Sequence, residues 1–272
     1  MFFFTKMQAT GNDFIIINEI ENEINYSYKL FAKFLCDRHF SIGGDGVILL
    51  EKSDVADFKM RILNQDGTEA EMCGNGIRCL GKYIYEKGLI DSDNISIETK
   101  SGIKNLLLKT EGNTVVEVKV NMGNYELNYE KIPVYFNGIE NGRIMIEGIE
   151  VFPISIGNPH AVCFVNDLDS IDIEKVGKLI ENFKYFPNRT NVEFVKLLNE
   201  DRIKIRVWER GVGETNSCGT GACAAAAISH LKKSTKDELI VELKGGNLKV
   251  NIKDDVELIG GAECVFEGKI KL

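Results

Sequence analysis

The sequence predicts an α+β protein that is built from two similar halves. Three observations predict this class: many short β-type runs, only a few helical segments, and an internal repeat that relates the two halves. The chain has 272 residues, which suits two domains of about 130 residues each. Strands and helices do not alternate strictly as βαβ units, so the pattern favours α+β.

Short runs of alternating or β-branched residues, separated by Gly, Asn and Asp, predict the strands. They lie at residues 13–18, 46–50, 58–63, 94–99, 114–120, 143–148, 161–165, 191–197, 203–208 and 238–252. Two clear helices are expected at 76–88 and 221–233, each after a glycine-rich turn. Shorter helices are expected at 27–39 and 172–183.

The internal repeat brings the two glycine-rich turns into register when the chain is shifted by 145 residues. The segment 60–76, MRILNQDGTEAEMCGNG, then lies over the segment 205–221, IRVWERGVGETNSCGTG. Cys73 meets Cys218, and the glycines that follow them coincide. We therefore expect two halves that are related by pseudo-symmetry.

Composition and charge exclude several classes of partner. Hydrophobic residues make up 44% and charged residues 27% of the chain, as in a typical globular protein. The 33 basic and 41 acidic residues give a net charge of −8, which provides no reason to expect nucleic acid or an anionic membrane as partner. The first residues lack the features of a secretory signal, and apolar runs are strand-sized. We expect a cytoplasmic protein.

The seven cysteines predict neither a disulfide framework nor a zinc site. Their number is odd, no pair has the two-residue spacing of a structural zinc site, and only three histidines are present. The pairs Cys73/Cys79 and Cys218/Cys223 have the wrong spacing for zinc. Five cysteines are expected to be small structural residues: Cys36, Cys79, Cys163, Cys223 and Cys264.

No motif indicates a cofactor. The run Gly76–Lys82 is similar to a phosphate-binding loop, but Tyr83 replaces the magnesium-binding hydroxyl and the run is predicted as helix. No lysine lies in a recognisable pyridoxal-phosphate context. The sequence therefore favours chemistry that uses no cofactor and no metal.

Each half presents a cysteine in a Cys-Gly-x-Gly turn at the start of a helix. Unpaired N–H groups and the positive end of the helix dipole at such a turn bind an anion, for example a carboxylate. The same field stabilises a thiolate, so we expect lowered pKa values for Cys73 and Cys218. A thiolate on one face of a carbon and a thiol on the other can invert an amino-acid α-carbon. The repeat therefore predicts Cys73 and Cys218 as the catalytic pair of an amino-acid epimerase.

The motifs in and around the repeat resemble those of the diaminopimelate epimerase family. In chain order they are TGNDF at 10–14, RHFSIGGDG at 38–46, NQDGTEAEMCGNGIRC at 64–79, GNPHAV at 157–162, RTNVEF at 189–194, and WERGVGET with CGTGACA within 208–224. The resemblance covers nearly the whole chain. It implies two domains, each a curved, mainly antiparallel sheet wrapped around a central helix, and a homodimer. It also implies a last strand that returns to the first half, giving domains 1–118 with 263–272, and 119–262.

The resemblance implies the interconversion of LL- and meso-2,6-diaminopimelate, on the route to lysine and peptidoglycan. It implies Cys73 as proton donor and Cys218 as proton acceptor, with His160 and Glu209 tuning the two thiols. Other positions match groups that bind the substrate: Asn12, Asn64, Gly74, Asn75, Asn158, Asn191, Glu209, Arg210, Gly219 and Thr220. The charges of Glu209 and Arg210 suit an ammonium and a carboxylate of the substrate.

The sequence departs from the family pattern at two places, and two other functions are also compatible with its motifs. Gly46 stands where glutamine is common, and Asn216-Ser217 precede Cys218 where a small apolar residue is more usual. One alternative is a cofactor-free racemase of the same architecture that acts on histidine, proline or another amino acid; a polar set such as Asn64 and Arg210 favours diaminopimelate. The other is a non-catalytic ligand-binding or thiol metal-binding protein, which predicts stoichiometric zinc.

Overall fold

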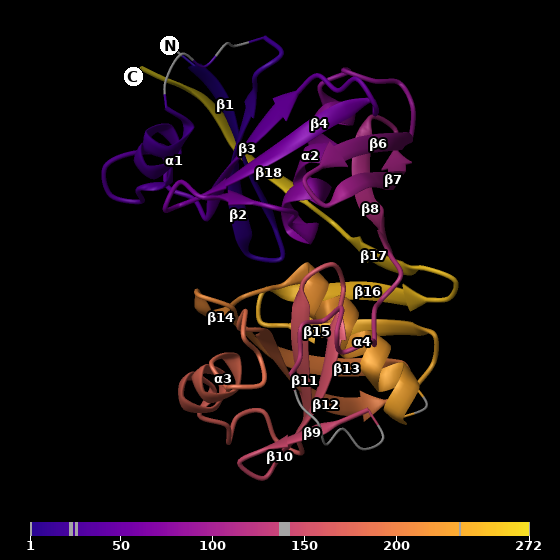
Figure 1. Ribbon diagram of the computed structural model, residues 1–272. Coiled ribbons are helices and arrows are strands. Elements are labelled where there is room, and N and C mark those ends of the chain that lie inside the picture. The colour runs from indigo at the N-terminus through magenta and orange to yellow at the C-terminus, as the bar shows by residue number, and fades with distance from the viewer. Residues whose placement is uncertain (1, 22–23, 25–26, 136–141, 234, 272) are drawn as a thin grey trace. The chain divides into compact units, whose positions relative to one another are not determined.

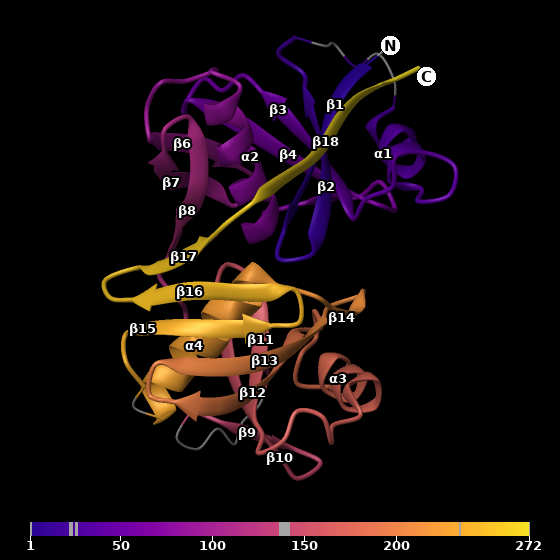
Figure 2. The same cartoon turned by 180° about the vertical axis from the view of Figure 1, so that it is seen from behind.

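The computed structural model describes residues 2–271 except 22–23, 25–26, 136–141 and 234 (Figures 1 and 2). The chain divides into two compact units. Unit 1 comprises residues 1–121 and 259–272, and unit 2 comprises residues 122–258. Among the described residues, no helix has both the length and the apolar character needed to cross a membrane.

Unit 1 is a twisted sheet around helix α2 (Gly74–Glu86), with helix α1 (Tyr28–Cys36) outside it (Figure 1). The strands are β1 (Phe2–Ala9), β2 (Asn12–Asn18), β3 (Gly46–Glu51), β4 (Phe58–Asn64), β5 (Glu69–Ala70), β6 (Asn94–Thr99), β7 (Gly102–Glu111), β8 (Thr114–Gly123) and β18 (Glu263–Ile270). The pairs β2–β3 and β4–β6 are parallel, and the pairs β1–β2, β3–β4, β4–β5, β6–β7 and β7–β8 are antiparallel.

The last strand completes unit 1 from the far end of the sequence. Strand β18 pairs antiparallel with β1, with Phe2 opposite Ile270 and Gln8 opposite Glu263. Figures 1 and 2 both show the yellow C-terminal strand running along the indigo N-terminal strand. Both ends of the chain are therefore tied into one sheet.

Unit 2 repeats this plan around helix α4 (Gly219–Lys233), with helix α3 (Ile173–Glu181) outside the sheet. Its strands are β9 (Ile144–Ile146), β10 (Ile149–Ser155), β11 (Pro159–Phe164), β12 (Asn191–Asn199), β13 (Arg202–Glu209), β14 (Gly213–Thr215), β15 (Glu238–Leu243) and β16 (Gly246–Ile252), and β17 (Val256–Gly260) follows them. The pairs β11–β12 and β13–β15 are parallel, and the pairs β10–β11, β12–β13, β13–β14 and β15–β16 are antiparallel.

The order of antiparallel and parallel pairs from β1 to β7 is the same as that from β10 to β16. The outer helix follows β2 in unit 1 and its counterpart β11 in unit 2, and the central helix follows the short strand β5 or β14. The predicted α+β fold of two pseudo-symmetric, mainly antiparallel domains is therefore confirmed.

The composition of the central helices explains why a sheet can enclose them. In α4 the residues from Gly221 to Ser229 are all buried, because this helix is apolar and small on every side. In α2 an added Cβ on Gly81 would lie 2.6 Å from Leu106 of β7, so glycine is needed for this close approach. A central helix with small residues lets the strands pack against it from several directions.

Several strands were not predicted from the sequence. These are β1, β5, β7, β10, β14 and β17. Strand β10 contains Pro153, which normally argues against a strand, and β7 contains three successive leucines instead of a clear alternation. Helices α2 and α4 begin two residues earlier than predicted, and this brings both glycine-rich turns into the first helical turn.

Candidate active site

Cys73 and Cys218 occupy the same place in the two units, directly before the central helix. Each sulfur accepts a hydrogen bond from the backbone N–H three residues later. The distances are 3.4 Å from Gly76 N to Cys73 Sγ and 3.4 Å from Gly221 N to Cys218 Sγ. The prediction that both cysteines lie at helix N-termini is confirmed. The first residues of the two helices are the buried Gly74 and Gly219.

Asn12 connects Cys73 to the loops of unit 1. Its Nδ2 donates to Asp45 Oδ2 at 2.6 Å, so its Oδ1 is turned toward helix α2. There Oδ1 accepts from Cys73 Sγ at 3.7 Å and from Nδ2 of the buried Asn75 at 3.3 Å. Asp45 is held by Arg38, whose Nη2 lies 2.8 Å from Asp45 Oδ1. Asn12 Oδ1 thus offers an acceptor to the thiol hydrogen of Cys73.

A hydrogen-bonded series of five side chains, which we call the Cys218 chain, ends at the other sulfur. Glu193 Oε1 lies 2.7 Å from His160 Nδ1, and His160 Nε2 lies 3.0 Å from Asn158 Oδ1. Asn158 Nδ2 donates to Thr220 Oγ1 at 3.4 Å, and Thr220 Oγ1 lies 3.4 Å from Cys218 Sγ. His160 and Glu193 are both 0% exposed. The chain therefore links a fully buried acid–base pair to the thiol.

The two half-sites differ in polarity at equivalent positions. In the parallel ladders, Phe14 of β2 holds the place that His160 holds in β11, and Ile48 of β3 holds the place of Glu193 in β12. All four side chains are buried. The Cys73 half-site is thus lined by apolar groups where the Cys218 half-site has titratable ones.

The expectation of a lowered pKa is wrong for Cys218. Burial raises the pKa of its thiol well above the usual value, and the charges of Glu209 and Glu193 raise it further. Hydrogen bonds from Thr220 and from the Gly221 N–H lower the pKa but do not offset these effects. The helix N-terminus is present as predicted, but loss of water and two carboxylates outweigh it. Neutralising these negative charges would remove part of what raises the pKa of Cys218.

Asn191, Glu209 and Arg210 lie together where β12 begins and β13 ends. Asn191 Oδ1 accepts from the Arg210 N–H at 3.0 Å, and Glu209 Oε1 accepts from the Thr215 hydroxyl at 2.5 Å. The exposed side chain of Arg210 donates to the Asn188 carbonyl at 3.2 Å. A carboxylate and a guanidinium are thus adjacent in unit 2.

Asn64 is placed differently from the other predicted binding residues. It lies at the exposed end of β4, and its Nδ2 donates to Thr68 Oγ1 at 3.0 Å within a turn. The sequence did not single out Asp45 and Glu193, although each supports a predicted residue. Glu193 is a charge within the apolar run NVEFV of a buried strand, and that contrast is the signal that could have identified it.

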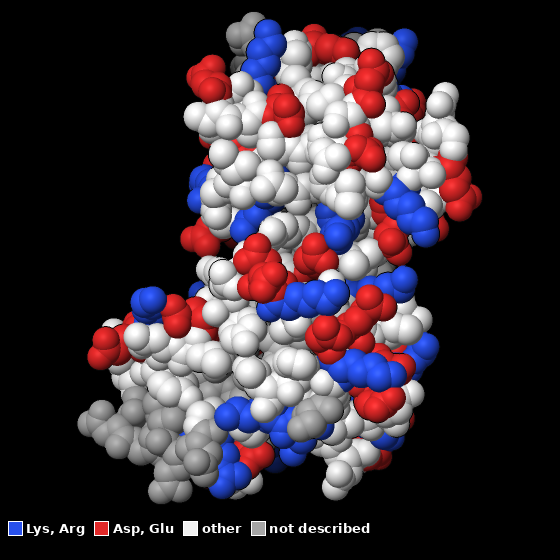
Figure 3. Space-filling view, turned by 90° about the vertical axis from the view of Figure 1, so that its right-hand side faces the viewer, with Lys and Arg blue, Asp and Glu red and all other residues white. Residues whose placement is uncertain are grey.

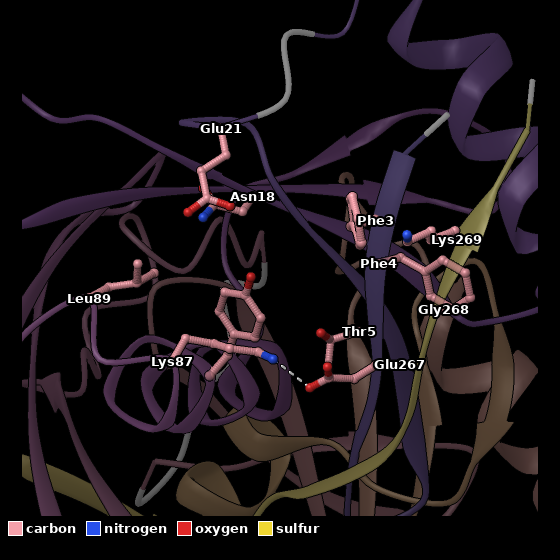
Figure 4. Close-up of a pocket in the computed structure, with 11 residues that line it drawn as sticks. Phe3, Phe4, Thr5, Asn18, Glu21, Lys87, Leu89, Glu267, Gly268 and Lys269 are labelled. Carbon is pink, nitrogen blue, oxygen red and sulfur yellow. Dashed lines mark hydrogen bonds and ion pairs between the residues drawn. The ribbon is translucent and has the colours of Figure 1, made fainter.

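A separate cavity lies within unit 1, away from these residues (Figure 4). It has a volume of about 490 Å³ and is lined by β1, β18 and the end of α2, including Phe4, Tyr83 and Leu89. Lys87 and Glu267 form an ion pair of 2.6 Å beside it. None of the predicted site residues lines this cavity, so we assign it no function.

Neither surface charge (Figure 3) nor grouped metal ligands indicates a further site among the described residues. On the face shown in Figure 3, acidic and basic side chains are interspersed and neither sign forms a large continuous patch. Among the residues that the structure describes, no group of three or more His, Cys, Asp or Glu side chains is arranged to hold a metal ion.

The sequence is closely similar to that of known enzymes. A family model described as diaminopimelate epimerase matches residues 4–128 and 152–265. The diaminopimelate epimerase of Methanococcus maripaludis strain C5 is 46% identical over 279 aligned residues, which cover 99% of both chains. The diaminopimelate epimerase of Agathobacter rectalis is 44% identical, again over 99% of both chains.

Solved structures share the fold at much lower identity. A hydroxyproline epimerase from Agrobacterium vitis, with bound trans-4-hydroxy-L-proline, aligns with a TM-score of 0.74 and 14% identity over 98% of this chain and 91% of that one. A phenazine biosynthesis protein of the PhzF family from Bacillus anthracis aligns with a TM-score of 0.72 and 19% identity, over 100% and 99% of the two chains. These two likenesses concern the fold alone.

Proposed function

The chain belongs to the diaminopimelate epimerase family, and we propose that it interconverts LL- and meso-2,6-diaminopimelate without a cofactor. The observation that carries this proposal is the duplicated cysteine turn. In both units a sulfur lies at the N-terminus of a buried helix and accepts from the same N–H at 3.4 Å. Two equivalent thiols, presented to one substrate carbon from opposite faces, are what a two-base inversion requires.

In this mechanism Cys218 removes the α-proton and Cys73 delivers a proton to the opposite face, and the reverse reaction exchanges these roles. The side-chain amides support the assignment. Asn12 turns its oxygen toward Cys73 and accepts from the thiol, whereas Asn158 turns its nitrogen toward Thr220, which can then donate to a Cys218 thiolate. Two amides at equivalent places in the repeat thus favour opposite protonation states of the two sulfurs.

The charged groups of the substrate can bind at the site and offset the negative charge that opposes a Cys218 thiolate. The turns Gly74-Asn75 and Gly219-Thr220 each present backbone N–H groups that can bind a substrate carboxylate and stabilise it as it gains enediolate character. A substrate ammonium at Glu209 neutralises one of the two carboxylates that hold the pKa of Cys218 high. Substrate binding thereby promotes the thiolate that the reaction needs. Arg210 donates hydrogen bonds to the second carboxylate, and Asn64 and Asn191 bind the distal amino-acid end.

Epimerisation is tested by incubating the reduced protein with LL-diaminopimelate in D₂O and following the products by NMR. We expect deuterium at the α-carbon together with meso product. Cys73→Ser and Cys218→Ser should each lower the rate by about 10²–10⁴-fold, the usual contribution of a general acid or base. Cys264→Ser is the matched control, because Cys264 is exposed and lies outside both turns. Deuterium exchange into proline, and none into diaminopimelate, would favour the alternative racemase.

We further propose that the protein is a cytoplasmic homodimer. Exposed apolar side chains on the neighbouring strands β1 and β18 support an interface on unit 1: Phe3 is 57%, Val265 is 55% and Phe266 is 47% exposed. Exposed apolar side chains of this size suit contact with another protein surface, and Phe266 lies beside Phe4 of β1, with 5.8 Å between the ring centroids. Light scattering of the purified protein distinguishes a dimer from a monomer.

A further inference from the structure

Glu193 is a buried acid with an incomplete set of hydrogen bonds. Its Oε1 faces His160 at 2.7 Å, while its Oε2 is buried without a hydrogen-bond partner among the described residues. An ionised carboxylate in such a place loses its water and receives little in return. A proton within the His160–Glu193 pair removes this cost, because the pair then carries no net charge.

The orientation of Asn158 indicates where that proton is. Its Oδ1 faces His160 Nε2, so Nε2 carries a hydrogen and donates it. The 2.7 Å contact on the other side of the ring needs a second hydrogen, located on Nδ1 or on the carboxyl of Glu193. In either case the pair holds two hydrogens and is neutral. The Nδ2 of Asn158 then donates to Thr220, whose hydroxyl hydrogen is left for the sulfur of Cys218.

Glu193 also lies close to the cysteine turn itself. A Cβ added to Gly221 would be 2.7 Å from Glu193 Oε1 and 3.4 Å from Cys218 Sγ, so the two atoms flank the same small space. At the equivalent Gly76 the corresponding neighbour is Ile48 Cδ1, at 3.1 Å. Only one of the two repeated turns therefore has an acid beside its sulfur.

We propose that the His160–Glu193 pair holds the proton that Cys218 gives up when it becomes a thiolate. The S–H bond of Cys218 breaks, and an N–H or O–H bond forms within the pair. The Cys218 chain carries one negative charge before and after this step, on the Glu193 carboxylate first and on sulfur afterwards, so the neutral pair with two hydrogens is the state in which Cys218 is a thiolate. Glu193 is thus a positioning residue that acts through its neighbours and does not touch the substrate.

The surroundings of the pair are consistent with a single shared charge. The titratable groups that face Glu193 are His160 and Cys163 on β11 and Cys218 at the start of α4, and Glu209 on β13 acts on Cys218. Burial raises the pKa of Glu193 and His160 lowers it, while Glu193 in turn raises the pKa of Cys218. Two adjacent negative charges are costly here, so ionisation of one group opposes ionisation of the other.

The inference rests on the proposed role of Cys218 as a base, but its test needs no substrate. Rates of alkylation by iodoacetamide are measured against pH for the wild type and Glu193→Gln, and mass spectrometry quantifies the Cys218 and Cys73 peptides separately. Glutamine keeps the shape and can donate to His160 but carries no charge. We expect at least about tenfold more Cys218 thiolate at a given pH, equal to about one pH unit. Cys73, which has Ile48 at the equivalent place, should be unchanged.

A second measurement does not depend on the folding of Glu193→Gln. Infrared spectra of the wild type and of Cys218→Ser record the band of the protonated carboxyl group against pH. If the proton is shared, removal of the thiol changes the pH at which the Glu193 band disappears. Equal midpoints in these two proteins, or equal Cys218 alkylation profiles in the wild type and Glu193→Gln, would overturn the inference. If the wild type shows coupled titration of Glu193 and Cys218 but does not epimerise LL-diaminopimelate, the proposed substrate is wrong and the inference about the pair stands.

Discussion

Replacement of Gly221 by alanine tests the geometry around Cys218 most directly. The new Cβ would lie 2.7 Å from Glu193 Oε1, whereas ordinary contact begins near 3.4 Å, so the oxygen must move by about 0.7 Å. That oxygen is fully buried and bonded to His160 at 2.7 Å, and it cannot move without loss of this contact. Gly76→Ala is the matched control, because its Cβ meets only the terminal methyl of Ile48 at 3.1 Å.

The expected difference between the two variants follows from opposing contributions. Alanine in place of glycine stabilises a helix by about 0.8–1 kcal/mol, and this gain applies to both variants. A hydrogen bond to a charged group contributes about 1.5–3 kcal/mol, and only Gly221→Ala loses one. We therefore expect Gly221→Ala to be destabilised by about 1–2 kcal/mol. In Gly76→Ala the 3.1 Å approach to Ile48 offsets much of the helix gain, so this variant should be near neutral.

Urea unfolding followed by circular dichroism measures both free energies under identical conditions. Because both single variants belong to the same protein, the difference between their free energies of unfolding is largely free of the error of extrapolation to water. In the double variant Glu193→Gln/Gly221→Ala the new methyl group lies against an uncharged amide instead of a carboxyl group. The free-energy cost of Gly221→Ala should therefore differ between this background and the wild type. Equal stability of Gly221→Ala and Gly76→Ala would refute the view that Glu193 is held rigidly against the cysteine turn.

Three further predictions concern charge, redox state and hydrogen bonding. Burial alone would raise the pKa of Asp13, but hydrogen bonds from Arg38 and Lys6 hold it well below the usual value of 3.8. Its stabilisation is therefore present above about pH 4 and is lost as pH falls, so Asp13→Asn should cost about 3 kcal/mol at pH 7 and progressively less in acid unfolding experiments. Mild oxidation of the two cysteines should inactivate the enzyme, and a thiol reductant should restore activity; full activity after quantitative oxidation of Cys73 and Cys218 would contradict the two-thiol mechanism. Thr220→Val should lower kcat/KM about tenfold by removing a donor to the thiolate, whereas Thr220→Ser should retain activity in the same assay.

The sequence predicts the duplicated fold well because the repeat is encoded locally. The two Cys-Gly-x-Gly turns and the periodic runs around them are visible without any knowledge of long-range pairing. Strand β10 was missed because Pro153 suppresses a strand prediction, although its position opposite Ala161 is tolerated. The return of β18 to β1 came from the family resemblance, since nothing local in the last residues indicates a partner at the other end of the chain.

The candidate site was predicted less completely, because its electrostatics depend on distant residues. The helix N-terminus predicts a stabilised thiolate at Cys218, but the carboxylates that oppose it come from other strands. Glu193 reaches His160 only because β11 and β12 pair in parallel, which places residues 33 positions apart in contact. A charged residue in a buried strand indicates a partner, but the sequence alone does not say which one.

The difference between the half-sites explains how a duplicated structure can support a reaction that needs unequal partners. A two-base inversion begins with one thiolate and one thiol, whereas an exact repeat would present two sulfurs of equal acidity. Phe14 and Ile48 are apolar at the two positions of the first unit that correspond to His160 and Glu193. His160 and Glu193 replace them in the second turn and can take the proton from Cys218. The differences at these two positions therefore help to explain how equivalent cysteines can start the reaction as a thiolate and a neutral thiol.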